Sequence, residues 1–251
     1  MISENIYKQY VDVLKRELVP ALGCTEPIAI AYASAKARET LGEFPEEILV
    51  ECSGNIIKNV KSVIVPKTHN MRGVEASAVI GAVGGNAKKE LEVLEDVTEA
   101  DVINTKELLD KKICHVSLKR EYTGLYIKVF MKNKNNTSSV TIIDTHTNIV
   151  DISKDGETIF ESDYVEKKEK LYDEKIFNVD LIYEFANTVK IEEVDKVIST
   201  QIEYNLRIAE EGLHQNYGAN VGKVLLHHSH DTATLAKAYY AAGSDARMAG
   251  C

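Results

Sequence analysis

Cys24 is the thiol whose position in the sequence most favours chemistry. It lies directly before Thr25, a residue type that commonly caps helix N-termini. The free N–H groups and positive dipole end at a helix N-terminus lower a thiol pKa and favour the thiolate, the form that acts as a nucleophile or metal ligand. The same residue type also suits a small, half-buried position in a tight loop. Both a functional and a structural role are therefore open for Cys24.

The other cysteines are spread widely along the chain. Cys52 and Cys114 lie on the apolar phase of predicted strands, and Cys251 is the last residue. Because a free cysteine behaves as a small hydrophobic residue, we expect Cys52 and Cys114 to fill the core.

Three histidines near the C-terminus offer ligand spacing for a metal. His227, His228 and His230 form an H-x-H pattern just before Asp231. No nearby cysteine or carboxylate set completes a familiar zinc pattern, and Asp231 is a typical helix N-cap. Solvated imidazoles in a loop are favoured over a metal site.

Two glycine-rich stretches differ from nucleotide-binding loops. Residues 218–224 have a short glycine spacing, and Val224 replaces the Ser or Thr that binds magnesium in a P-loop. Residues 81–85 end a helical pattern instead of opening a helix after a strand. Nucleotide binding therefore has no support in the sequence.

The composition is that of a globular protein. The chain has 251 residues, of which 44% are apolar and 27% charged, and a formal net charge of -9. No cluster of basic and aromatic residues offsets this charge, which argues against a nucleic-acid partner. No apolar run reaches the ~18 residues of a membrane span, and the N-terminus lacks a secretory-signal pattern. We therefore expect reduced thiols and a cytoplasmic location.

Local patterns predict the elements that position these residues. Ser3 is placed to cap the first helix, Gly42 follows the second, and a capping box begins at Thr98. Gly212 and Gly243 are predicted to end two later helices. Apolar periodicity and these signals predict helices over residues 4–18, 26–41, 73–85, 98–111, 179–189, 191–212 and 231–242.

The middle of the chain has strand periodicity. Residues 48–52 alternate as in a strand, and residues 113–152 read as an antiparallel meander. The charged segment 154–175 indicates a solvated connector or sheet edge. This order predicts an α+β fold, in which residues 1–44 and 171–251 form a helical framework and residues 45–170 an α+β lobe with an antiparallel β-meander.

Several separated motifs, taken together, resemble the L-cysteine desulfidase family, which is related to the α-chain of iron–sulfur L-serine dehydratases. The resemblance extends from near residue 20 to the last residue. The motifs are Gly-Cys-Thr-Glu-Pro at 23–27, Ser-Gly-Asn-Ile-Ile-Lys-Asn at 53–59, residues 81–85 leading to 91–94, residues 208–213 with 217–223, and residues 243–251.

The resemblance implies a cytoplasmic lyase with an iron–sulfur cofactor. Members of the family convert L-cysteine to pyruvate, ammonia and sulfide, or L-serine to pyruvate and ammonia. They use a [4Fe–4S] cluster held by three cysteines and no pyridoxal phosphate. Cys24 and Cys251 correspond to two of the cluster ligands. The third is expected beyond residue 251, in a C-terminal portion that this chain lacks.

The chemistry of β-elimination requires a Lewis acid for the leaving group, a base for the Cα proton, and groups that hold the substrate. An iron with an open coordination position supplies the Lewis acid. Arg247 suits the substrate carboxylate, Asn55 and Asn220 could hydrogen-bond the substrate, and Glu26 could hold the ammonium or accept a proton. Each also has a structural interpretation: a surface ion pair for Arg247, turn formation for the asparagines and a favourable first-turn acid for Glu26.

An iron–sulfur β-eliminating lyase is therefore the favoured function. We expect a small-molecule amino-acid substrate and a homo-oligomer, with neither nucleic acid nor membrane as a partner. The alternative is a non-catalytic small-molecule-binding or assembly subunit that needs a partner chain to complete the site. A hydrolase with Cys24 as nucleophile is a third interpretation, but it lacks a convincing base.

Overall fold

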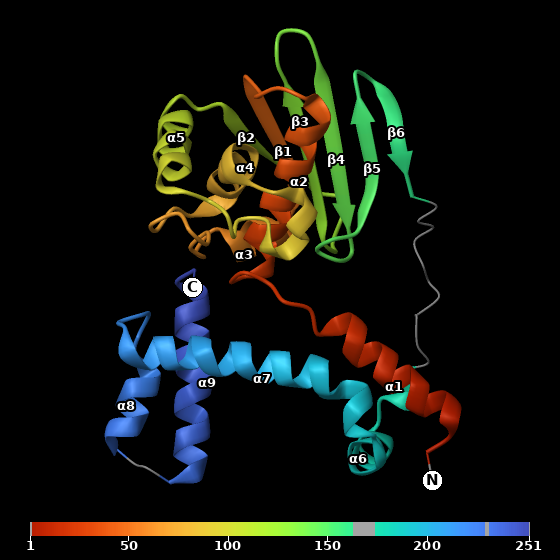
Figure 1. Cartoon of the computed structure of the whole chain (residues 1–251). Coiled ribbons are helices and arrows are strands. Elements are labelled where there is room, and N and C mark those ends of the chain that lie inside the picture. Colours follow the sequence, from red (N-terminus) through yellow and green to blue (C-terminus); the bar gives the residue numbers. More distant parts are fainter. Residues whose placement is uncertain (1, 163–173, 229–230, 251) are drawn as a thin grey trace.

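The chain folds into an α+β part above a layer of helices (Figure 1). The computed structural model describes residues 2–162, 174–228 and 231–250. One six-stranded sheet and its covering helices form the upper part, and the helices near both ends of the chain form the lower part. The α+β class predicted from the sequence is confirmed.

The sheet has the strand order β2-β1-β3-β4-β5-β6. Strands β3 to β6 are consecutive and antiparallel, which confirms the predicted meander from β3 to β5 and adds β6 as an exposed edge strand. The strands are β1 Glu47–Ser53, β2 Cys114–Lys119, β3 Tyr126–Lys132, β4 Thr137–Ile143, β5 Ile149–Lys154 and β6 Glu157–Glu161.

The prediction that β2 belongs to the meander was wrong. β2 pairs in parallel with β1, with Ile48 opposite Cys114, while β1 also pairs with β3. A parallel pair needs a long crossover, and the helices between β1 and β2 supply it. They are α3 Gly54–Val60, α4 Gly73–Gly84, the 3₁₀ helix η1 Ala87–Glu92 and α5 Glu99–Asp110, which begins with the predicted capping box.

The main core lies between the sheet and the pair of helices α2 (Thr25–Leu41) and α4. A Cβ atom on Gly81 of α4 would lie 2.3 Å from the carbonyl oxygen of Ala31 in α2, so only glycine permits this approach. Cys52 and Cys114 are buried in this core, as predicted. Side chains that are fully buried here include Ile28, Ile30, Ile80, Ile127 and Ile142.

The packing of α2 differs from the expected division of the chain. Residues 1–44 were assigned together to the helical framework, but α2 contacts β3, β4 and α4. Its surface is apolar and made of small residues almost all round, so it needs neighbours on several sides. The main core provides these neighbours, and α2 therefore lies with the sheet.

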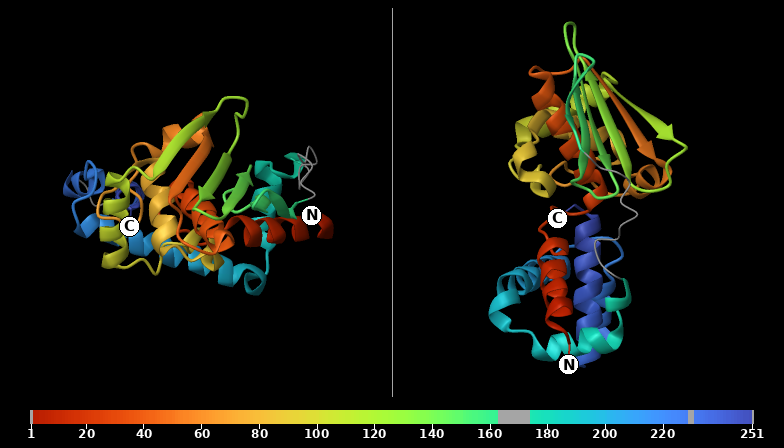
Figure 2. Two further views of the ribbon diagram at one scale, coloured as in Figure 1. Left: turned by 90° about the horizontal axis from the view of Figure 1, so that it is seen from above. Right: turned by 90° about the vertical axis from the view of Figure 1, so that its right-hand side faces the viewer.

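Figure 2 shows the lower helices from two further sides. A second, smaller core lies among the helices at residues 4–17 and 174–188 and the start of the helix at residues 191–214, around Tyr10, Phe185 and Val194. Ser3 caps the first of these helices, as predicted, because its side chain accepts a hydrogen bond from the Ile6 N–H. The elements are α1 Glu4–Glu17, the 3₁₀ helix η2 Glu174–Ile176, α6 Val179–Thr188, α7 Ile191–His214, α8 Val221–His228 and α9 Thr232–Met248. Among the described residues, no helix combines the length and apolar character needed to cross a membrane.

Gly212 and Gly243 do not end helices, contrary to the prediction. Both lie inside longer helices, α7 and α9. A Cβ atom on Gly212 would lie 2.1 Å from the carbonyl oxygen of Ala242, and Gly243 lies against Ala209. These glycines therefore let two helices approach closely, a role that local sequence does not distinguish from helix termination.

Candidate active site

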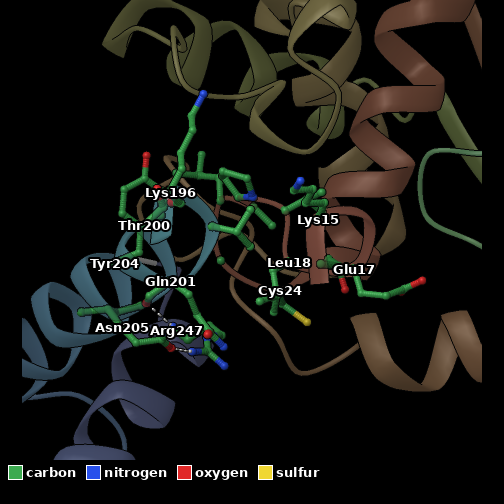
Figure 3. A pocket seen from close by; sticks show the side chains of 18 of the residues that line it. Lys15, Glu17, Leu18, Cys24, Lys196, Thr200, Gln201, Tyr204, Asn205 and Arg247 are labelled. Atoms are coloured by element: carbon green, nitrogen blue, oxygen red, sulfur yellow. Dashed lines mark hydrogen bonds between the residues drawn. The ribbon is translucent and has the colours of Figure 1, made fainter. Parts of the chain in front are cut away.

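A pocket of about 840 Å³ lies between the loop that joins α1 to α2 and the middle of α7 (Figure 3). Cys24 enters it from the loop, and Arg247 enters it from the last turn of α9. These two residues are far apart in the sequence, and the fold brings both to one cavity. The other lining side chains include Lys15, Glu17, Glu193, Lys196, Thr200, Gln201, Tyr204 and Asn205.

The backbone around the pocket has defined supports. The Leu22 N–H donates a hydrogen bond to the Leu91 carbonyl in η1, which holds the α1–α2 loop against the upper part of the molecule. At the end of α9, Gly250 packs against Ile64 and Pro66. The turn that carries Arg247 is therefore held beside the upper part of the molecule.

Cys24 itself, not Thr25, is the N-cap residue of α2, so the predicted boundary was wrong by one residue. Its thiol is half-buried, and Sγ donates a hydrogen bond to Glu26 Oε2 at 3.0 Å. Burial, with a further contribution from the Glu26 carboxylate, raises the pKa of Cys24 to about 11. The predicted lowering of this pKa was wrong, because these effects outweigh the helix N-terminus.

Glu26 belongs to a small polar cluster with residues from two other elements. Asn59 Nδ2 of α3 donates to Glu26 Oε1 at 3.1 Å, and His146 lies close enough in the β4–β5 loop to interact electrostatically. Burial tends to raise the pKa of Glu26, but the hydrogen bonds from Cys24 and Asn59, together with His146, hold it below its usual value. Burial lowers the pKa of His146, although the negative charge of Glu26 acts to raise it. Glu26 is therefore a carboxylate beside the Cys24 thiol.

The pocket contains charges of both signs. Arg247 is exposed, and its Nη2 donates to Asn205 Oδ1 of α7 at 3.2 Å. Lys15 and Lys196 add positive charge, whereas Glu17 and Glu193 add negative charge. Guanidinium and ammonium groups bind a carboxylate, and carboxylates bind an ammonium. The lining thus suits a small zwitterion such as a free amino acid.

Glu26 and the two candidate asparagines lie outside the set of residues that line this pocket, although Glu26 contacts the lining residue Cys24. Asn55 Nδ2 donates to the Thr123 carbonyl at 2.8 Å, so its amide joins α3 to the loop before β3. Asn220 lies between α7 and α8 with a φ of 56°, and its Oδ1 is buried without a hydrogen-bond partner in the described part of the chain. Asp245 Oδ2 of α9 is likewise buried without one.

The described residues supply one thiol to the pocket, that of Cys24. Cys251 and His230 lie outside the described residues, whereas the rings of His227 and His228 lie 5.7 Å apart at the end of α8. Within residues 2–162, 174–228 and 231–250, no group of three or more His, Cys, Asp or Glu side chains could hold a metal ion. A thiol is nevertheless the ligand type that iron–sulfur clusters use, so Cys24 fits the role of one ligand.

Sequence reasoning missed several residues of this region. Lys15, Lys196, Tyr204 and Asn205 occupy ordinary helical positions, and no motif marks them. His146 is a single histidine in a turn between two strands. Only Asn59 lay within a motif, at the end of the 53–59 stretch, and no role was assigned to it.

The chain is similar to UPF0597 proteins of several bacteria. The protein of Lachnoclostridium phytofermentans is 53% identical over 247 residues, which cover 98% of this chain and 59% of the relative. The protein of Treponema denticola is 45% identical over 258 residues, or 100% of this chain and 60% of the relative. That of Desulfitobacterium hafniense is 45% identical over 251 residues, or 99% and 58%.

No protein-family model and no solved structure matches the chain. The name UPF0597 states no activity, substrate or cofactor. The chain is thus similar to UPF0597 proteins along nearly its whole length, and it spans about three fifths of the length of these relatives.

Proposed function

We propose that this chain carries the substrate pocket of a cytoplasmic, iron–sulfur-dependent lyase that catalyses β-elimination from L-cysteine or L-serine. The observation that carries the proposal is that Cys24 and Arg247 line the same pocket. The motifs that contain these residues resemble the L-cysteine desulfidase family, and the two lie at opposite ends of the sequence. Their shared cavity is what such a site requires.

The proposal gives a role to each of the main candidate site residues. Cys24, as a thiolate, would be one ligand of a [4Fe–4S] cluster, with Cys251 as the second and another polypeptide segment supplying the third. When bound, the cluster would supply a Lewis acid to the leaving group at an iron with an open position. Arg247, oriented by Asn205, would bind the substrate carboxylate, helped by Lys15 and Lys196.

Glu26 accepts a hydrogen bond from the Cys24 thiol. Its carboxylate would hold the substrate ammonium or accept a proton, and Asn59 keeps Oε1 in place. Asn220 retains an unused buried acceptor, which suits a donor group supplied by a ligand or a partner. The Asn55 amide is already used in the fold.

Anaerobic reconstitution with iron and sulfide tests the proposal. We expect the chain, coexpressed with the unmatched portion of the Lachnoclostridium phytofermentans relative, to bind iron, absorb broadly in the visible range and form pyruvate from cysteine or serine. Cys24→Ser should lose iron and pyruvate together, whereas Cys52→Ala, in the buried core, should keep both. Iron binding that is unchanged by Cys24→Ser would refute this ligand assignment.

Arg247→Lys tests the carboxylate site separately from the cluster. Lysine keeps the charge but loses the bidentate geometry, so we expect a higher KM with unchanged iron content. Arg207→Lys is the matched control, because Arg207 lies on α7, pairs with Glu203 and does not line the pocket. Equal kinetics for the two variants would remove Arg247 from the substrate site.

A non-catalytic small-molecule-binding or assembly subunit is the second candidate function. The single thiol among the described pocket residues favours it, because a cluster needs further thiol ligands from elsewhere. It requires cysteine or serine to bind without pyruvate formation, which calorimetry and a pyruvate assay measure on the same sample. Turnover by the 251-residue chain alone would exclude it.

A further inference from the structure

The exposed apolar side chains of this protein are concentrated in its lower helices. Of the 20 large hydrophobic side chains that are exposed among the described residues, 13 lie between residues 177 and 248. The larger upper part, residues 25–161, has six of the other seven. Patches of this kind on a folded protein mark interaction surfaces.

The clearest patch is a groove between α7 and α9, with a volume of about 400 Å³. Ala209 and Gly243, which pack against each other, form its base. Ile202 and Leu206 of α7, 53% and 47% exposed, form one wall, and Tyr240 of α9, 82% exposed, belongs to the other. We call these five residues, with Tyr239, the α7–α9 groove; Asn205 and Arg247 of the candidate active site also line it.

The middle of α7 is open to solvent on every side. Each residue from 201 to 207 is exposed, although this segment contains Ile202, Tyr204 and Leu206. Ile202 and Leu206 are four residues apart and therefore lie on one helical face. A helix with such a face is normally covered by another apolar surface, and tyrosines such as Tyr240 are enriched in protein interfaces.

The lengths of the relatives indicate what covers the groove. The matched residues make up 59% of the Lachnoclostridium phytofermentans relative and 98% of this chain, so α7 and α9 have counterparts there. The remaining two fifths of the relative is polypeptide of domain size. An apolar helix seated between two helices is a common way to fill such a groove.

We propose that the α7–α9 groove is the docking surface for the polypeptide that makes up the unmatched two fifths of the relatives, which seats the apolar face of a helix between Leu206 and Tyr240. This inference does not depend on the lyase reaction. It requires only that the groove is covered, and that the cover comes from the unmatched part and not from a second copy of the matched part.

Photo-cross-linking in the complete Lachnoclostridium phytofermentans relative tests this docking. A benzoylphenylalanine at the position aligned with Tyr240 should cross-link within one chain to the unmatched portion, as peptide mass spectrometry detects. The matched control places the probe at the position aligned with Ile159, which is 59% exposed on the edge strand β6. We expect no cross-link to the unmatched portion from this position. A second probe at the position aligned with Leu206 guards against failure of the first variant to fold.

Two results would overturn the proposal. Cross-links from these groove positions to the matched region of another copy would show that self-association covers the groove. Folded protein whose groove positions give no cross-link would show that the groove stays open. Light scattering of the 251-residue chain, with and without Tyr240→Asp, measures its mass in solution and separates these cases. Self-association through the groove predicts a larger mass that Tyr240→Asp reduces, whereas an open groove predicts the same mass for both.

Discussion

The helix pairs α2–α4 and α7–α9 use the same local chemistry but have different surroundings. In both, a glycine faces a backbone carbonyl: Gly81 meets Ala31, and Gly212 meets Ala242. The first pair lies under the sheet and is enclosed in the main core, whereas the second leaves an apolar groove exposed. Close helix contact is therefore a local property, but the covering of the outer faces depends on what else the fold provides.

The largest difference between the two pairs is expected when one large side chain is removed from each. Ile30→Ala in α2 should lower the free energy of unfolding by about 4 kcal/mol, because Ile30 is fully buried and the change leaves a cavity. The same change at Ile202 of α7, 53% exposed, should cost less than about 0.5 kcal/mol. Urea unfolding measures both. A cost at Ile202 similar to that at Ile30 would mean that the groove is covered in solution.

Adding a methyl group at the two glycine contacts should destabilise both helix pairs, but the region that opens should differ between them. Gly81→Ala and Gly212→Ala should each cost about 2 kcal/mol, because the new Cβ would overlap a backbone carbonyl. Hydrogen exchange should show faster opening throughout the main core for Gly81→Ala, but mainly in α7 to α9 for Gly212→Ala. Gly54→Ala is the control, since its Cβ would meet Leu118 at an ordinary 3.8 Å.

Alkaline pH should weaken the main core before the small one. Burial raises the pKa of both Cys52 and Cys114 from 9.0 to about 12, so the unfolded chain releases these protons first and stability falls as pH rises from about 9 towards 12. In the small core, burial raises the pKa of Tyr10 from 10.0, so the loss of stability from this group begins only above pH 10. Urea midpoints across this pH range should flatten in Cys52→Ala/Cys114→Ala. An unchanged slope would contradict the assignment to these thiols.

The smallest difference between the two parts is expected at the helix caps, whose contributions to stability should be alike. Thr98→Ala at α5 and Asn178→Ala at α6 each remove a side-chain acceptor for a backbone N–H, at a cost of about 1 kcal/mol. Thermal unfolding measures this cost. Thr98→Ser and Asn178→Asp keep the acceptor and should retain most of the stability. A cost confined to one of the two caps would show that the parts do not unfold together.

The elements predicted well are those with signals inside a few residues. The Ser3 cap, the capping box at Thr98 and Gly42 after α2 each act within one turn of the chain, and the structure contains all three. The prediction failed where distant residues decide. β2 joins β1 across a long crossover, and Gly212 serves a contact with Ala242. The short helices α3 and α8 were also missed.

The candidate site shows the same division. Cys24 was singled out by its position before a predicted helix and Arg247 by the family resemblance, and both line one pocket. The pKa of Cys24 could not be predicted from its position at a helix N-terminus, because burial and Glu26 act against the helix dipole. His146 and Lys196 reach the site from elements that no local pattern connects to Cys24.

The sequence by itself determined the α+β class, the caps at Ser3, Gly42 and Thr98, and the apolar faces, since periodicity and capping are properties of neighbouring residues. Only the tertiary structure decided that α2 packs on the sheet, that Cys24 and Arg247 line one pocket, and that the α7–α9 groove remains exposed. These features depend on pairs of segments far apart in the chain. Their energies come from packing and burial between surfaces, which the order of residues along one segment does not contain.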